Sequence, residues 1–488
     1  MFTTKPVSRR MILKQAAAAA GAVSLPYLIP SSALGLDDIV APSNRVAYGY
    51  IGCGYHGMGW NFDQVFRCPD AQIIAVCDVD AEHLDAAQKK VEDHYGRELG
   101  KNYTGCSSFS DFRDLIHRKD IDVVGIATPD HWHVIPAIMA AKAGKDVICE
   151  KPLTLTVAEG RIVADVAQQT GCIFQTASEN RSIDVYLRLI ELVRGGVLGA
   201  IRHIEVRLPM GNTNMRVGGA AKETFTMLAE EEPPKCLNFE MWLGQAPLMP
   251  YVPARVHGNY RWNLAFSGGV ICDWGAHMVD LAQWGHDTEH TGPVSVEGKG
   301  DFPPIDAIHN TAPTFDVHYQ YADGVTMTVS AGSGDVSPQQ HDGPIVGRTP
   351  QPGIRFEGAD GWIESHGWRG SLRASRREML DVAIDPAVAK IYRPSEVVPR
   401  EAGVGGEHRN FVDCVKLRQP CYAPAETGHR TITIPHIGNI AMRLGRKLDW
   451  NPETERFVDD SEADAMLSRQ QREPWTIGNI DSWIGKNS

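Results

Sequence analysis

Short apolar runs alternate with helical stretches between about residues 45 and 177, and this alternation constrains the fold more than any other feature of the sequence. The apolar runs are expected strands, at residues 45–52, 71–80, 120–129, 145–152 and 171–177. Stretches with helical periodicity lie between them, at residues 81–96, 133–144 and 157–171. Repeated strand–helix–strand units of this kind predict a doubly wound parallel sheet for residues 44–177.

A glycine-rich turn follows the first expected strand. Gly52, Gly54 and Gly57 form the pattern G-x-G-x-x-G between a strand and a helix, and Tyr55 and His56 lie inside the pattern. In that setting, glycines let the backbone approach a pyrophosphate at the helix N-terminus. The turn therefore predicts a dinucleotide site, with Tyr55 and His56 among its contacts, rather than an ordinary tight turn.

An acidic residue ends the second expected strand. Asp78 stands close to the offset at which a carboxylate accepts hydrogen bonds from the adenosine ribose hydroxyls. A carboxylate there would repel a 2′-phosphate, and no arginine follows it directly. The sequence therefore favours NAD over NADP.

Polar residues also follow two later strands, where a doubly wound sheet binds its ligands. Thr128, His131 and His133 follow one strand, and Glu150 and Lys151 follow the next. Lys151 is expected to point at the cofactor with Glu150 beside it, and the other three are expected as secondary cofactor contacts. Paired histidines can hold a metal, but no further ligands at recognisable spacing accompany them, so no metal site is predicted.

Residues 268–280, GGVICDWGAHMVD, read as the start of a buried helix that carries ionisable groups on one face. Asp273 and His277 are four residues apart, a spacing that suits a carboxylate orienting an imidazole for proton transfer. Two other interpretations stay open, in which Asp273 caps the helix or both residues bind a metal. Asp280 shares the face, but nothing beyond its spacing supports a role.

After about residue 178 the pattern changes to strands without helices between them. The expected strands lie at residues 294–300, 314–322, 325–333 and 353–367, and helices are expected near residues 406–418 and 426–446. This pattern predicts a second α/β domain with an antiparallel sheet over residues 178–450, and a C-terminal extension over residues 451–488.

A long segment around residues 208–265 interrupts the second half and is rich in aromatic and basic residues. Its flat rings and hydrogen-bond donors predict a sugar-binding wall, although a dimer surface or a packing arm fits the composition equally well. Just after the last strand of the first domain, Arg181 is a similar candidate for a substrate contact. The wall candidates are Arg255, His257, Tyr260, Arg261 and Trp262.

The first 35 residues have the pattern of an export signal. Arg9 and Arg10 stand in S-R-R-x-x-L-K, followed by a short Ala-rich apolar run and small residues at positions 31–33. The run is too short and too interrupted by proline to span a membrane comfortably. We interpret the segment as a twin-arginine signal that directs the protein to the periplasm or out of the cell; the alternative is a basic disordered tail.

Composition indicates the class of partner. The formal net charge of -12 disfavours nucleic acid or an anionic membrane surface as the main ligand. The ten cysteines contain no C-x-x-C pair, so neither a zinc knuckle nor a disulfide framework is legible. A small molecule is the expected ligand.

Taken in order, these motifs resemble those of the Gfo/Idh/MocA family, which includes glucose-fructose oxidoreductase and inositol dehydrogenase. The glycine fingerprint is followed by T-P-x-x-x-H at residues 128–133, E-K-P at 150–152 and G-G-x-x-x-D-x-G-x-H at 268–277. The resemblance covers about residues 44–450. It implies an N-terminal Rossmann domain and a C-terminal α/β domain whose large open, mainly antiparallel sheet often mediates oligomers, so a homo-oligomer is expected.

The resemblance also implies an activity, which is hydride transfer between the nicotinamide C4 and a carbon bearing a sugar hydroxyl. His277 would take or give the hydroxyl proton, Lys151 would hydrogen-bond the same oxygen, and Asp273 would position the substrate or the imidazole. The chain departs from the family pattern in its leader, in the 208–265 insertion, and at Asp130, where many members carry asparagine.

The leader and the cofactor constrain each other. A protein that folds before export can carry a dinucleotide with it, whereas a cofactor released in each cycle would be lost outside the cytoplasm. We therefore expect a tightly held NAD(H) that is reduced and reoxidised in place. Such a site can serve a sugar oxidoreductase or, as an alternative, an enzyme that cleaves glycosides by transient oxidation and elimination. A cofactor-binding sensor without turnover is a further alternative, which the presence of Lys151, Asp273 and His277 together disfavours.

Overall fold

The structure, a computed structural model, describes residues 40–41, 44–100, 102–211, 230–332, 352–391 and 406–485. The chain separates into two units, residues 1–45 and residues 46–488, and every element below belongs to the second unit. The expected export signal at residues 1–35 lies outside the described residues. Among the residues that are described, no helix is both long and apolar enough to cross a bilayer.

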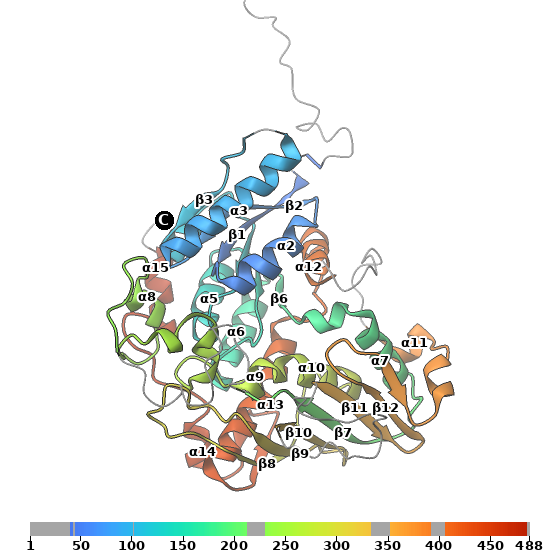
Figure 1. The fold of residues 1–488 in the computed structure, drawn as a ribbon. Coiled ribbons are helices and arrows are strands. Elements are labelled where there is room, and N and C mark those ends of the chain that lie inside the picture. Colours follow the sequence, from blue (N-terminus) through green and yellow to red (C-terminus); the bar gives the residue numbers. More distant parts are fainter. Residues whose placement is uncertain are drawn as a thin grey trace, which may run out of the picture. The chain divides into compact units, whose positions relative to one another are not determined.

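The first layer is a six-stranded sheet in the order β3-β2-β1-β4-β5-β6 (Figure 1), and all its neighbouring strands are parallel. Every residue of β4 and β5 is buried, as expected for strands covered on both faces. The strand order reverses between β1 and β4, which opens a crevice at their carboxyl ends. The predicted doubly wound sheet is thus confirmed. Its strands are β1 (Val46–Ile51), β2 (Ala71–Cys77), β3 (Ser107–Phe109), β4 (Val123–Ile126), β5 (Asp146–Cys149) and β6 (Phe174–Thr176).

Helices flank this sheet with the caps that the sequence provides. The α3 helix (Ala81–Leu99) begins where the Asp80 carboxylate accepts hydrogen bonds from two backbone N–H groups. The α6 helix (Val157–Thr170) is capped at its N-terminus by Thr156. It is followed by Gly171, which has a left-handed backbone conformation. The other elements of this half are a π-helical turn (Gly57–Asn61), α2 (Phe62–Phe66), α4 (Phe112–Ile116), a 3-10 turn (Asp130–Trp132), α5 (Val134–Lys142) and a 3-10 turn (Glu179–Ser182).

The second layer is a nine-stranded sheet in the order β13-β12-β11-β7-β10-β9-β8-β14-β15. Only the β7–β10 pair is parallel, so the prediction of a mainly antiparallel sheet is confirmed. Along β9 and β10, buried residues alternate with more exposed ones, so one face of the sheet is covered and the other is open. Association of copies through this sheet stays a prediction. The strands are β7 (Ile201–Leu208), β8 (Ser295–Gly300), β9 (Phe315–Gln320), β10 (Thr326–Ala331), β11 (Gly353–Gly358), β12 (Gly361–Ser365), β13 (Leu372–Ala374), β14 (Leu448–Asn451) and β15 (Arg456–Phe457).

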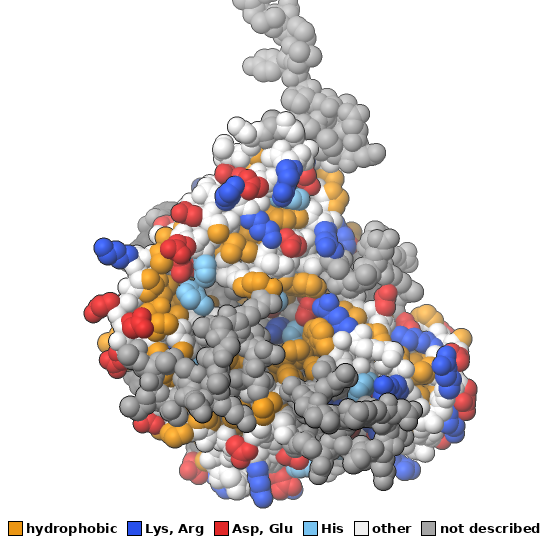
Figure 2. All heavy atoms as spheres, in the orientation of Figure 1, with side chains coloured by type: hydrophobic (Ala, Val, Ile, Leu, Met, Phe, Trp, Pro, Cys, Tyr) orange, Lys and Arg blue, Asp and Glu red, His pale blue; other side chains and the backbone are white. Residues whose placement is uncertain are grey.

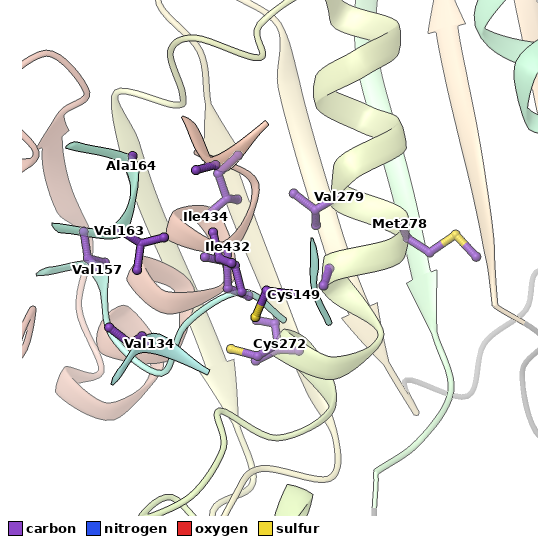
Figure 3. Close-up of a cluster of buried hydrophobic side chains, with 14 of the residues drawn as sticks. Val134, Cys149, Val157, Val163, Ala164, Cys272, Met278, Val279, Ile432 and Ile434 are labelled. Atoms are coloured by element: carbon purple, nitrogen blue, oxygen red, sulfur yellow. The ribbon is translucent and has the colours of Figure 1, made fainter. Parts of the chain in front are cut away.

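Three helices lie between the two sheets: α7 (Asp184–Arg194), α10 (Gly275–His286) and α13 (Ala425–Leu444). The α13 helix packs on α6 of the first layer and on α10 and β8 of the second. One hydrophobic core therefore runs through both layers. Figure 3 shows part of it, with labelled side chains from α5, β5, α6, α9 (Val270–Asp273), α10 and α13.

The C-terminal part of the chain returns to the first layer. On α12 (Gly406–Leu417), the Phe411 ring packs edge-on against Tyr48 of β1, with ring centroids 6.3 Å apart. The α15 helix (Ile480–Ile484) packs on α5. The expected helices at 406–418 and 426–446 are confirmed, whereas the domain limits at residues 177 and 450 stay predictions. The remaining elements are α8 (Phe239–Leu243), α11 (Pro386–Ala389), α14 (Ser461–Ala465) and 3-10 turns at Pro253–Arg255, His257–Trp262, Arg377–Asp381 and Ile477–Asn479.

Candidate active site

A cavity of about 670 Å³ lies at the carboxyl edge of the parallel sheet. Eight of the predicted cofactor residues line it, and they come from the ends of β1, β2, β4 and β5. These residues are Gly52, Gly54, Tyr55, His56, Asp78, Thr128, Glu150 and Lys151. On the face of the molecule shown in Figure 2, acidic and basic side chains are interspersed.

The glycine turn is shaped by close backbone contacts. Gly52 has φ +90°, and a Cβ there would lie 2.5 Å from the carbonyl carbon of Ala127. A Cβ on Gly57 would lie 2.4 Å from the Gly52 oxygen. A Cβ on Gly54, in contrast, would meet nothing within 4 Å, and this residue lines the cavity. Gly52 and Gly57 therefore hold the turn together, and Gly54 leaves room for a ligand.

Asp78 is held at the end of β2 by backbone donors. The N–H groups of Cys53 and Asp80 donate to its two carboxylate oxygens, at 2.6 and 2.9 Å. Burial raises the pKa of this carboxyl, and the two N–H donors oppose that shift. A carboxylate has about four lone-pair sites, so Asp78 retains acceptors for hydroxyl groups in the cavity.

Two predicted cofactor contacts, His131 and His133, are not among the residues that line the cavity. The His131 side chain is buried with Nε2 2.9 Å from the Trp242 carbonyl oxygen, and burial lowers its pKa to about 4. The His133 ring nitrogens lie 2.8 and 3.0 Å from the carbonyl oxygens of Pro152 and Thr128. Both rings therefore brace the backbone behind the cavity. The Thr128 Oγ1 is buried with no hydrogen-bond partner among the described residues.

A buried ion pair stands beside the cavity. Lys151 Nζ lies 2.9 Å from Asp273 Oδ1, and the two side chains are only 11 % and 4 % exposed. Arg261 Nε lies 3.3 Å from the same oxygen. Burial alone would raise the pKa of Asp273, but the two cations hold it well below its usual range. Asp273 is therefore ionised and fixes the ammonium of Lys151.

His277 lies near this pair but is not oriented by Asp273. The predicted continuous helix is interrupted at Trp274, so Asp273 ends α9 and His277 lies on α10. No side-chain cap from Asp273 is present at α10, which also removes the capping interpretation. Burial and the nearby Lys151 charge lower the pKa of His277 well below its usual value, so the ring is neutral at pH 7. A neutral imidazole can accept a proton.

Sequence reasoning missed Glu179, which approaches His277 from the turn after β6. Glu179 Oε1 lies 4.0 Å from His277 Nδ1, and Glu179 Oε2 lies 3.0 Å from Arg369 Nη2. Burial and the Glu407 charge raise the pKa of Glu179 to about 7, although Arg369 opposes the shift. The available signal was its position three residues after a strand, at the same sheet edge as Asp78 and Lys151.

Aromatic rings that the sequence did not single out surround His277. The His277 ring centroid lies 4.9 Å from that of Trp368 and 6.0 Å from that of Trp274. The Arg369 guanidinium lies 5.4 Å from the ring centroids of both Trp60 and Trp368. These rings are partly exposed, so they offer flat apolar surface beside a proton acceptor.

The insertion forms one wall of the cavity, and we call its residues 236–262 the cover segment. The cover segment packs around its own hydrophobic cluster and pairs with the first layer through a bridge between Leu237 and Asp80. Its hydroxyl-bearing Tyr260 donates to Asp130 Oδ1 at 2.8 Å. The segment residues that line the cavity are Met241, Trp242, His257, Gly258, Asn259, Tyr260 and Arg261.

The remaining wall candidates do not face the cavity. Trp262 is 5 % exposed and belongs to the main hydrophobic core, and Arg255 donates to the Pro250 carbonyl oxygen. Neither is among the residues that line the cavity, and their contact with a substrate stays a prediction.

One group of metal-ligating side chains occurs among the described residues. Asp80, His83 and His257 bring one ligand atom each within 4.8 Å of one another. One Asp80 oxygen already caps α3 by accepting from the His83 N–H and the preceding N–H group. The group lies at the Asp78 end of the cavity, which His83 and His257 also line.

Arg181 forms buried ion pairs at this position, and its expected contact with a substrate stays a prediction. Its guanidinium is 2 % exposed and makes two hydrogen bonds to the Asp280 carboxylate, at 2.7 and 2.8 Å. A third hydrogen bond, of 2.6 Å, reaches Glu289. Arg181 lines a separate hollow beside Trp284 and Tyr422. Asp280, which the sequence left without a role, is therefore the buried partner of Arg181.

The Gly54→Ala variant is expected to fold and to lose the dinucleotide. Gly54 does not have a positive φ, and its added Cβ would enter open space in the cavity rather than protein. We expect an unchanged melting temperature and at least a 10-fold loss of NAD content in the purified protein. Gly57→Ala is the matched control, because its Cβ meets backbone and should lower the melting temperature. Full NAD content in Gly54→Ala would contradict placement of the pyrophosphate at this turn.

The Asp280→Asn variant is expected to lose stability and to keep its cofactor. Removing one partner of a buried ion pair costs about 3 to 5 kcal/mol, and Arg181 would keep Glu289 and the Tyr422 carbonyl oxygen as partners. Asp287→Asn, with a side chain 68 % exposed, is the control and should cost less than about 1 kcal/mol. Urea unfolding and NAD content measure the two effects. Unchanged stability with reduced NAD content would restore Arg181 to the ligand site.

Comparison with solved structures supports the architecture. The aldose-aldose oxidoreductase from Caulobacter crescentus superposes with a TM-score of 0.54 at 17 % sequence identity, covering 83 % of this chain and 99 % of that one. The WlbA dehydrogenase from Bordetella pertussis, solved with NADH and UDP-GlcNAcA, gives a TM-score of 0.56 at 16 % identity, with 83 % and 99 % coverage. At these identities the likeness concerns the fold.

Curated relatives match over a shorter stretch. A glycosyl hydrolase family 109 protein from Shewanella pealeana is 32 % identical over 214 residues, which is 41 % of this chain and 45 % of the relative. An alpha-N-acetylgalactosaminidase from Shewanella oneidensis is 30 % identical over 199 residues, or 39 % and 42 % of the two chains. The matches thus span less than half the length of these relatives.

Family comparison covers most of the chain. Residues 46–178 match the NAD-binding Rossmann fold of an oxidoreductase family, and residues 188–346 and 396–477 match the C-terminal alpha/beta domain of the same family. The first match contains the cavity-lining residues from Gly52 to Lys151, and the second contains Asp273 and His277. The chain belongs to the Gfo/Idh/MocA family of oxidoreductases, and its first layer is an NAD-binding Rossmann domain.

Proposed function

We propose that the protein oxidises a sugar hydroxyl, or reduces the corresponding carbonyl, with NAD held in the cavity at the edge of the parallel sheet. The observation that carries this proposal is the fixed Lys151–Asp273 pair beside a neutral His277. A hydroxyl that loses hydride must also lose its proton, and these groups supply a hydrogen-bond donor and a proton acceptor.

The residues of the cavity fit the dinucleotide. The open space at Gly54 suits a pyrophosphate, Asp78 has acceptors for ribose hydroxyls, and the unpartnered Thr128 Oγ1 is available to the cofactor. When bound, NAD supplies the hydride acceptor or donor. Asp273 holds the ammonium of Lys151 toward the substrate oxygen, and His277 takes the hydroxyl proton or returns it.

Glycoside cleavage is the second candidate function. The curated relatives named as glycosyl hydrolase family 109 proteins and as an alpha-N-acetylgalactosaminidase favour it. Transient oxidation of a glycoside, elimination of its aglycone and reduction of the product would leave no net change in NAD. A sensor without turnover is disfavoured, because binding alone needs no fixed ammonium beside a proton acceptor.

The cover segment supports retention of the cofactor. It lines the cavity from His257 to Arg261, and it is tied to the first layer where the Ala81 and Asn238 N–H groups donate to carbonyl oxygens across the contact, at 2.8 and 2.9 Å. We propose that NAD stays bound through turnover and is carried through the twin-arginine route to the periplasm or beyond. The cofactor would then be loaded in the cytoplasm.

Retention predicts that purified protein lacking residues 1–35 contains near-stoichiometric NAD(H). Acid denaturation should release the dinucleotide into the supernatant, where an enzymatic cycling assay measures it. The Gly54→Ala variant provides the low-occupancy control. A supernatant without dinucleotide from the unmodified chain would contradict retention.

Turnover is expected to change the absorbance of the bound nicotinamide when a panel of aldoses and 4-nitrophenyl glycosides is added. Lys151→Ala and His277→Ala should each lower kcat by about 10²- to 10⁴-fold, because each removes a group that handles the substrate hydroxyl. Lys89→Ala, on the exposed face of α3 with a side chain 74 % exposed, is the lysine control. Unchanged rates in the first two variants would refute their roles.

Release of 4-nitrophenol distinguishes the two candidates in the same panel. A dehydrogenase changes nicotinamide absorbance without releasing nitrophenol, whereas the glycoside-cleaving enzyme releases nitrophenol with no net change. If no sugar or glycoside in the panel gave either signal, both candidate functions would be contradicted.

A further inference from the structure

Hydride transfer as described above assigns no role to one partly buried acid near His277. Glu179 begins the short turn after β6, and its side chain is 13 % exposed. It is not one of the described residues that line the cavity. Burying a carboxyl group costs free energy unless the group is paired, so the stability of Glu179 at this position depends on the groups that face it.

Glu179 stands between an imidazole nitrogen and a guanidinium cation. On one side, His277 Nδ1 is buried without a hydrogen-bond partner among the described residues and faces Glu179 Oε1 at 4.0 Å. On the other side, Glu179 Oε2 pairs with Arg369 at 3.0 Å. The unsatisfied Nδ1 is the atom that a carboxylate stabilises when an imidazole gains a proton at its other nitrogen.

Arg369 is itself held in place. Its backbone N–H donates to the Tyr186 hydroxyl of α7 at 3.0 Å. Its guanidinium lies near the rings of Trp60, from the first layer, and Trp368. The cation is therefore anchored at the junction of the two layers, and so is the carboxylate that pairs with it.

Other charges that act on Glu179 come from several elements. Glu407 of α12 and Glu150 at the end of β5 disfavour its ionised form, whereas Arg369 and His56 favour it. The pKa of Glu179 is raised to about 7 by burial first and by Glu407 next. Near neutral pH the carboxyl can therefore both accept and release a proton.

We propose that Glu179 is the proton partner of His277. Glu179 receives the proton of the substrate hydroxyl through the His277 imidazole and passes it to solvent. This role rests on the proposed function. In oxidation, the hydroxyl proton moves to His277 and the Nδ1 proton moves to the Glu179 carboxylate, while hydride leaves to NAD. In reduction the same protons move in the opposite direction. Glu179 is thus a positioning residue that acts through His277, and Arg369 sets its charge.

The proposal predicts a different change in the pH profile of kcat for each of two substitutions. Glu179→Gln should lower kcat by about 10²-fold with little change in KM, and should remove an ionisation near pH 7 from the profile of kcat. Arg369→Gln removes a cation that favours the carboxylate, so the same ionisation should move to higher pH. Glu179→Asp should restore part of the rate. Glu297→Gln, at an exposed position of β8, is the matched control.

The kinetic substrates are D-glucose and 4-nitrophenyl N-acetyl-α-galactosaminide, followed by nicotinamide absorbance and nitrophenol release. A second measurement needs no turnover. Infrared difference spectra of the NAD-loaded protein, titrated across neutral pH, should show a protonated carboxyl band that is absent in Glu179→Gln and shifted to higher pH in Arg369→Gln.

The outcomes separate this inference from the proposed function. Without turnover of any sugar by the unmodified protein, the proposed function fails, and the infrared titration still tests the Glu179 ionisation. If turnover occurs but Glu179→Gln keeps both its rate and its ionisation near pH 7, the inference fails and the function stands. Should Glu179→Gln not fold, an ionisation that fails to move in Arg369→Gln overturns the inference.

Discussion

The site depends on a single carboxylate. Asp273 lies on α9, Lys151 follows β5 of the first layer, and Arg261 belongs to the cover segment, so three segments meet at one oxygen atom. A buried ammonium or guanidinium without a counter-ion is strongly unfavourable. The Asp273 charge therefore allows Lys151 and Arg261 to remain together in the interior, and it ties α9 to the end of β5 and to the cover segment.

The two sides of the site have different electrostatic character. On the cofactor side, Glu150 accepts from His56 and from the Lys151 backbone N–H, and its pKa is held below its usual range by His56 and Lys151 despite burial. Around His277, burial dominates: it lowers the pKa of His277, so the ring is neutral, and it raises the pKa of Glu179 to about 7. Fixed charges thus stand where the cofactor binds, and groups that can change their charge stand where a hydroxyl would react.

Much of this arrangement could be predicted from the sequence, because parallel strands deliver their C-terminal residues to one edge. That rule placed Gly54, Asp78 and Lys151 around one cavity. The rule failed for His131 and His133, since residues after a strand can also turn back into the core and bond to carbonyl groups. Helical spacing likewise suggested that Asp273 orients His277, but a break at Trp274 redirects the carboxylate to Lys151.

Other parts of the site could not be read from local pattern at all. Arg369 lies 190 residues after Glu179, and only the folding of the β12–β13 loop onto the first layer brings them together. The pairing of Arg181 with Asp280 is similarly non-local. The sequence indicated Arg181 as a candidate substrate contact and indicated no role for Asp280, whereas the structure joins the two in a buried ion pair. Tertiary contacts of this kind carry no signature in a single sequence.

The return of the C-terminal chain to the first layer has a consequence for biosynthesis. Phe411 completes the packing over Tyr48, and Trp475 and Trp483 lie against Trp132 and Phe112, with ring centroids 5.3 and 6.4 Å apart. The ribosome makes these residues more than 230 positions after the strands of the first layer that they cover. The nucleotide-binding half therefore cannot reach its final packing until the polypeptide has been synthesised at least as far as Trp483.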